Sequence, residues 1–254
     1  MIQWRTRQLP AETNYLKIKS FLSSDENSSI LNYYQLGKCT IRKSCLTILL
    51  LSIMDTQLFD ILRNQEQLGY SVHCYNRNTW GILGIEIDIT SQEKKHPVDV
   101  VNDRIEKFLR EYFKKYLDEM TEDALKIIIN SQIKLKTAKE IDLSSEFRRN
   151  WNEIKNEHYM FDRKEQEVEM FKTLTKSELI EFYQSEILSS TVRKLSIQII
   201  GQSDRMTETS NELIDEDDNS LKLQLVIEKS GEHNEIIIQD ITEFQNKLIL
   251  NPIH

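Results

Sequence analysis

A polar break joins a helical segment to a strand in the stretch Leu58-Phe59-Asp60-Ile61-Leu62-Arg63-Asn64-Gln65-Glu66-Gln67-Leu68-Gly69-Tyr70-Ser71-Val72. Upstream of the break, residues 44–54 carry no charge, and a helix that is apolar nearly all round is typically buried. Gly69 ends the helical region, and the residues after it have strand character. Arg63 and Tyr70 flank the break, where an arginine can simply complement a helix C-terminus and a tyrosine can simply pack on a strand.

Strand patterns lie on both sides of this helix. Before it, residues 15–19 and 29–34 are predicted to pair as antiparallel strands. After the break, residues 70–75 and 80–90 are predicted to form a hairpin whose turn is the polar segment 76–79. Apolar residues alternate with acids along the second of these strands, which indicates a strand with one face exposed.

A block of helices follows the hairpin. Pro97 stands at a first helical position, and apolar residues then recur every three or four positions as far as Tyr116. Thr175 and Glu178 have the spacing of a capping box. Further helices are predicted at residues 121–135, 144–159, 162–171 and 176–188.

The chain returns to a strand at 193–200, where Leu195, Ile197 and Ile199 share one face. Strands, a hairpin, a helix block and a returning strand predict an α+β fold with an antiparallel or mixed sheet packed by helices. The regular alternation of a doubly wound sheet is not found.

The C-terminal part is predicted to belong to the same single domain, spanning 1–254. It contains an acidic stretch at about 202–220, which is predicted to be a solvated loop insertion. Residues 221–227 and 235–238 are predicted to pair as a last hairpin, and 241–248 to form a closing helix.

Composition excludes several functions. Thirty-three Lys and Arg against 41 Asp and Glu give a formal net charge of −8, which suits nucleic acid poorly as a partner. The eleven uncharged residues at 44–54 are too few to span a membrane, which takes about 20. Three cysteines and no signal-peptide pattern predict free thiols in a cytoplasmic protein.

No catalytic residue or metal ligand is predicted. None of the five histidines is four residues from another on a helix, and the segment beginning at His96 lacks both zinc-peptidase motifs, H-E-x-x-H and H-x-x-E-H. His73 and Cys74 are adjacent on a strand and should point to opposite faces. Nucleophile elbows and phosphate-binding glycine motifs are also missing from the sequence.

The break and its surroundings resemble the C-terminal domain of the large M16 zinc metallopeptidases of the nardilysin and insulin-degrading enzyme type. The corresponding family segment reads R-T-K-E-Q-L-G-Y or a near variant. The resemblance extends over about residues 3–201, and it is closer to the nardilysin branch. Further matching segments lie at residues 75–84, 133–136, 149–154 and 174–179.

This resemblance implies an M16 (LuxS/mitochondrial processing peptidase-like) metallohydrolase domain. The full-length family has four homologous α+β domains; the first carries zinc on an inverted motif and the last is catalytically silent. Carried over to this chain, Arg63 and Tyr70 are the residues that contact the main chain of a peptide substrate. No cofactor is expected in this chain, and its expected partner is an N-terminal catalytic half, in cis or in trans.

Two functions remain open. The first is a non-catalytic domain that clamps peptides for a zinc endopeptidase held elsewhere. The second is a pseudo-peptidase domain that binds proteins and has no role in proteolysis. Since the chain lacks H-x-x-E-H, we expect it to be inactive alone under either hypothesis.

Overall fold

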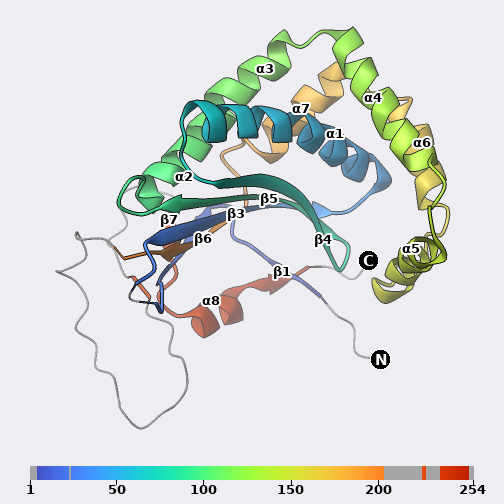
Figure 1. The fold of residues 1–254 in the computed structure, drawn as a ribbon. Coiled ribbons are helices and arrows are strands. Elements are labelled where there is room, and N and C mark those ends of the chain that lie inside the picture. The colour runs from blue at the N-terminus through green and yellow to red at the C-terminus, as the bar shows by residue number, and fades with distance from the viewer. Residues whose placement is uncertain (1–4, 23, 203–224, 227–234, 252–254) are drawn as a thin grey trace.

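A curved mixed sheet with helices over one face forms the body of the protein (Figure 1). The computed structural model describes residues 5–22, 24–202, 225–226 and 235–251. The sheet has the strand order β4-β5-β3-β6-β2-β7. Its strands are β2 (Thr13–Lys19), β3 (Asn27–Lys38), β4 (Ser71–Thr79), β5 (Ile82–Gln92), β6 (Lys194–Ile200) and β7 (Glu235–Ile237). The predicted α+β class is therefore confirmed.

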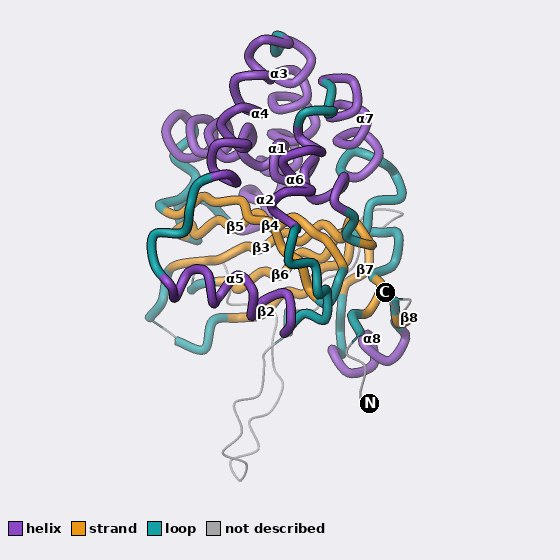
Figure 2. The backbone as a smooth tube through the Cα atoms, turned by 90° about the vertical axis from the view of Figure 1, so that its right-hand side faces the viewer, coloured by secondary structure: helices purple, strands orange, loops and turns teal. Residues whose placement is uncertain are grey.

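Most of the helices form a layer over one face of this sheet, and Figure 2 shows the two layers edge-on. The helices are α1 (Ile41–Leu58), α2 (Val98–Lys107), α3 (Lys114–Glu119), α4 (Glu122–Thr137), α5 (Leu143–Lys155), α6 (Arg163–Phe171), α7 (Lys176–Glu186) and α8 (Ile241–Lys247). Two π-helical segments, η1 (Phe59–Gln65) and η2 (Phe108–Phe113), directly follow α1 and α2. In Figure 1, α5 lies beside the sheet, at the end of the helix layer.

A second, two-stranded sheet joins the two ends of the described chain. β1 (Arg7–Gln8) pairs antiparallel with β8 (Ile249–Leu250), so that Arg7 lies opposite Leu250. β1 and α8 lie on the side of the large sheet away from the helix layer (Figure 1).

The predicted pairing of the first two strands is wrong. β6 lies between β2 and β3, parallel to β2 and antiparallel to β3, and Ile197 is the register partner of both Leu16 and Leu31. The chain reaches this position only after the whole helix block, so the neighbour of β2 is distant in sequence. A local pattern identifies strands but cannot show that a later strand separates them.

The hairpin turn is shorter than predicted and lies further along the chain. β4 continues through residues 76–79, and Thr79 is paired with Ile82. The turn is Trp80-Gly81, with φ of 49° and 77°. Positive φ at both central residues is typical of the type I′ turn, whose twist matches that of paired strands.

The core is centred on α1, which packs on β4 and against α6 and α4. Leu49, Leu50 and Leu58 are completely buried, together with Ile85 and Ile89 of the sheet. The continuous helix Ile41–Gln65 is long and apolar enough to cross a membrane by composition, but 56% of its most apolar window is buried inside the fold. It is therefore the core helix that the sequence predicts.

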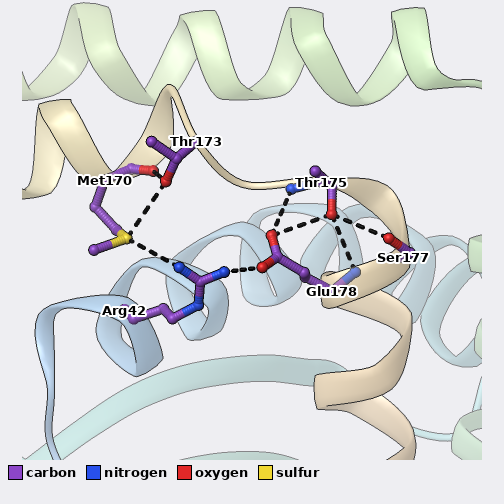
Figure 3. A network of polar contacts seen from close by, with 6 residues as sticks. All are labelled: Arg42, Met170, Thr173, Thr175, Ser177 and Glu178. Atoms are coloured by element: carbon purple, nitrogen blue, oxygen red, sulfur yellow. Dashed lines mark hydrogen bonds and ion pairs between the residues drawn. The ribbon is translucent and has the colours of Figure 1, made fainter.

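A polar network fastens α1 to the start of α7 (Figure 3). Arg42 forms an ion pair with Glu178, and its guanidinium also donates to the sulfur of Met170 at 3.8 Å. Thr175 and Glu178 form the predicted capping box, in which each side chain accepts from the other residue's backbone N–H. The network thus satisfies the first turn of α7 and holds it against α1.

The face of β6 that lies under the helices is polar. Leu195, Ile197 and Ile199 do share a face, but it is the less buried one. Lys194, at 2% exposure, Ser196 and Gln198 lie on the buried face. Alternation therefore identifies the strand and its apolar face correctly, and the structure shows that the polar face is the more buried of the two.

Lys194 is at the centre of a buried polar cluster between the sheet and α2. Its Nζ lies 2.7 Å from Oε1 of Glu106, and the hydroxyl of Tyr34 donates to the same carboxylate at 2.9 Å. Burial lowers the pKa of Lys194, although the Glu106 carboxylate opposes this. Burial alone would raise the pKa of Glu106, but the ammonium and the hydrogen bonds it receives hold that pKa below its ordinary value.

Part of the C-terminal prediction lies outside the described residues. This applies to nearly all of the acidic stretch 202–220, and to most of 221–227. Within the described part, β7 pairs in parallel with β2, and Leu225 forms an isolated bridge to Ile18. The closing helix is present as α8.

Candidate functional site

The polar break is built on the π-helical end of the core helix. The backbone N–H of Glu66 donates to the carbonyl of Ile61 at 2.9 Å, five residues back, and that of Leu68 donates to Leu62 at 3.0 Å. The wider turn places Arg63 in the last turn of η1, where a cation complements the negative end of the helix dipole. Single π turns of this kind are frequent at functional sites.

Three features fix the path of the chain through the break. Gln67 adopts a left-handed backbone with φ of 53°, and the side chain of Leu68 is anchored in the core with 4% exposure. The backbone N–H of Tyr70 donates to the carbonyl of Thr90 at 3.1 Å, which starts the pairing of β4 with β5. These contacts set the distance between η1 and the first residue of the strand.

Gly69 is needed because the break passes very close to β5. A Cβ at this position would lie 2.2 Å from the carbonyl oxygen of Thr90, which is backbone and cannot turn away. Glycine is required here because a side chain would not fit, and not because of backbone conformation, since φ of Gly69 is not positive.

We expect Gly69→Ala to destabilise the fold by about 1–3 kcal/mol, because overpacking forces the backbone to shift. Equilibrium urea unfolding measures this. Ser71→Ala, two residues along the same segment, is the matched control and should leave the midpoint nearly unchanged. A Gly69→Ala protein with wild-type stability would contradict the close approach.

An ion pair ties the break to the helix layer. Arg104 of α2 contacts Glu66 with two nitrogens, Nε at 2.7 Å and Nη2 at 2.6 Å from the two carboxylate oxygens. Such paired contacts are geometrically specific. Glu66 is therefore fully engaged by Arg104.

Arg63 and Tyr70 line one open pocket of about 230 Å³ on the surface of the break. Tyr70 is 62% exposed, and Arg63 is half-buried. Within the described structure, neither side chain makes a hydrogen bond or ion pair. The structure thus brings the two predicted residues together and leaves their donors accessible.

Four further polar residues share the pocket and were not predicted. They are Gln67, Gln92, Lys95 and His96. The last three come from the end of β5 and its connection to α2, which the β4–β5 pairing brings beside the break. In the sequence, His96 stands out only as a possible metal ligand, and no local pattern connects Lys95 with Arg63.

His96 is unusual in that its Nε2 is buried without a hydrogen-bond partner among the described residues. Burial lowers the pKa of His96, the neighbouring Lys95 adds to this effect, and the backbone of Gln67 opposes it. The imidazole is therefore biased toward its neutral form at neutral pH.

The described residues contain no group of three or more His, Cys, Asp or Glu side chains placed to hold a metal ion. His73 is exposed and Cys74 is buried, so they point to opposite faces as predicted. Cys39, Cys45 and Cys74 are free thiols, as predicted. Burial raises the pKa of Cys45 to about 12, and the pKa values of the other two are also raised, which makes none of them a ready nucleophile.

Comparison with known proteins agrees with this architecture. A family model described as PQQ synthase PqqF-like, C-terminal lobe domain 4, matches residues 49–151. Nardilysin of Rattus norvegicus is 32% identical over 257 residues, covering 100% of this chain and 22% of the rat protein. Insulin-degrading enzyme of Homo sapiens is 28% identical over 255 residues, covering 100% of this chain and 24% of the human enzyme.

The crystal structure of pitrilysin has the same fold. It superposes with a TM-score of 0.73 at 16% identity, covering 97% of this chain and 24% of the pitrilysin chain. The chain belongs to the M16 peptidase family. Within that family it corresponds to a C-terminal domain and is more similar to nardilysin than to insulin-degrading enzyme. It spans about a quarter or less of the length of these relatives.

Proposed function

We propose that this chain is a non-catalytic C-terminal domain that clamps the main chain of peptide substrates for an M16 zinc endopeptidase. The observation that carries the proposal is the shared pocket of Arg63 and Tyr70, whose side chains have no partner within the described structure. Groups held in position but left unpaired are available to a ligand.

The two side chains suit different tasks on a peptide. The guanidinium of Arg63 presents a fixed fork of donors, which can orient peptide carbonyls without reading side chains. The phenol of Tyr70 can donate to a carbonyl oxygen on which negative charge develops, where a positioned donor helps most. In the family, zinc in another domain supplies the activated water.

The sheet offers a second element for holding extended peptides. β4 begins one residue after Tyr70 and lies at the edge of the described sheet, where it pairs with β5. The outer edge of such a strand presents backbone N–H and C=O groups to which an extended peptide can add as a further strand. A peptide bound there would run directly past the pocket.

The remaining parts of the enzyme must come from other domains, in cis or in trans. We propose that α5 contributes to this contact. Phe147 and Trp151 stack with ring centroids 6.0 Å apart and are 63% and 50% exposed, and Leu143 is 81% exposed. Exposed apolar clusters of this kind typically mark protein interaction surfaces. Free thiols are compatible with the proposed cytoplasmic location.

The same α5 surface also favours the alternative function, a pseudo-peptidase domain that binds proteins without any role in proteolysis. The two functions differ in what they require of the pocket. The clamp needs Arg63 and Tyr70 next to a reacting peptide, whereas the alternative needs only the exposed helix.

Mixing the chain with the zinc-bearing N-terminal half of a nardilysin-type peptidase tests the proposal. We expect hydrolysis of a short fluorogenic peptide to rise at least tenfold over that of the N-terminal half alone, since positioning groups contribute rates of this order or more. The chain alone should show none. Stable association of the two parts without any gain in turnover would contradict the clamp and favour the protein-binding alternative.

A further inference from the structure

The pocket at the break is cationic, although the chain as a whole has a net charge of −8. Its lining includes Arg63, Lys95 and His96 and contains no aspartate or glutamate. Within the described structure, the side chain of Lys95, like that of Arg63, makes no hydrogen bond or ion pair. Two cationic side chains therefore face one small volume, and no described residue that lines it carries a negative charge.

The acids closest in sequence to the pocket are all engaged elsewhere. Glu66 is held by Arg104 through both of its oxygens. Glu93 accepts from the hydroxyl of Ser28 at 2.5 Å and from the backbone N–H of Val98 at 3.1 Å. Asp60 accepts from Gln65 at 2.9 Å. Among the described residues, the carboxylates nearest in sequence thus leave the cations of the pocket free for an external anion.

We propose that this pocket accepts a carboxylate of the bound peptide, supplied either by an acidic side chain or by the peptide C-terminus. The carboxylate would lie between the guanidinium of Arg63 and the ammonium of Lys95, within reach of the Tyr70 hydroxyl. A volume of about 230 Å³ accommodates such a group, whereas a folded partner would need a larger surface. The inference rests on the proposed peptide clamp and adds a preference to it.

The pKa of His96 should show whether a carboxylate is bound in the pocket. Its pKa is lowered by burial and by Lys95, and the charged groups at the pocket wall beside it, Arg63 and Lys95, are both cations. An anion bound among them favours the imidazolium, so the pKa of His96 rises when the pocket is filled. A neutral peptide lacks this effect.

The test uses three fluorescein-labelled peptides of equal length at low salt. One is neutral with an amidated C-terminus, one carries a single glutamate and is amidated, and one is neutral with a free C-terminal carboxylate. We expect at least one carboxylate peptide to bind the chain about 5- to 10-fold more tightly than the neutral peptide by fluorescence anisotropy. The same peptide should raise the pKa of His96 in an NMR titration. Comparing the two carboxylate peptides identifies the source of the anion.

Lys95→Gln should remove most of this gain and leave binding of the neutral peptide nearly unchanged. Lys94→Gln is the matched control: it removes the same charge from the adjacent residue, whose Nζ pairs with Glu26 at 2.8 Å. Equal binding of all three peptides would overturn the carboxylate site and leave the clamp intact. Equal losses in the two lysine variants would also overturn it, in favour of a general charge effect. Failure of every peptide to bind would contradict the clamp and the carboxylate site together.

Discussion

Tyr70→Phe is expected to lower kcat/KM of the two-part enzyme about 100-fold while the chain keeps its wild-type melting temperature. Removal of one donor to a developing oxyanion typically costs this much or more in rate. The fold should not be affected, because the ring is 62% exposed and its hydroxyl makes no contact that stabilises the described structure. Steady-state kinetics of the reconstituted mixture and thermal unfolding of the isolated variant measure the two effects.

Tyr75→Phe is the matched control for this variant. Tyr75 lies on β4, five residues after Tyr70, and is 49% exposed, but it does not line the pocket. Loss of the Tyr75 hydroxyl should leave kcat/KM of the two-part enzyme within about twofold of the wild type. A donor outside the pocket gives the transition state no stabilisation. If Tyr70→Phe and Tyr75→Phe behave alike, the proposed role of Tyr70 is wrong.

Glu106→Gln is expected to destabilise the fold by about 3–5 kcal/mol, which is the usual cost of removing one partner of a buried ion pair. The variant leaves the ammonium of Lys194 buried at 2% exposure without the carboxylate that it contacts directly. Urea unfolding measures the loss. The double variant Glu106→Gln/Lys194→Met should recover most of it, because an apolar side chain of similar length needs no counter-charge. A single variant as stable as the wild type would show that the pair does not act as a charged pair.

The same pair predicts how stability depends on acid pH. The pKa of Glu106 in the folded state is held below its ordinary value, mainly by Lys194 acting against burial. Its contribution is therefore fully present above the ordinary glutamate pKa and is lost as the pH falls through the lowered, folded-state pKa. Unfolding free energies measured between pH 6 and pH 3 should fall more steeply for the wild type than for Glu106→Gln. Parallel curves would contradict this assignment.

Local features of the fold were predictable from sequence, and long-range ones were not. The core helix, the capping box of Thr175 and the strand at 193–200 each depend on residues a few positions apart, and the structure contains all of them. The place of β6 beside β2 depends on residues 181 positions apart, since Thr13 is the register partner of Lys194. Hydrophobic alternation also could not show that the polar face of β6 is the covered one, because Lys194 is stabilised there by a partner on another element.

The residues of the candidate site also divide into those that a local motif identifies and those that only the tertiary structure brings together. Arg63 and Tyr70 lie on either side of a single break, so one local sequence motif contains both residues and identifies them. Lys95 and His96 join them only because β5 pairs with β4 and returns to the break. Their relevance depends on tertiary structure, and a sequence motif gives no sign of it.

The antiparallel pairing of β1 with β8 has a practical consequence for protein engineering. Since Arg7 lies opposite Leu250, the described chain starts and finishes at one edge of the molecule (Figure 1). A flexible tether joined directly before Arg7 or directly after Leu250 would therefore leave from the same place. A catalytic module could be fused before or after this domain, and a permuted gene with the original ends joined should still encode the same sheet.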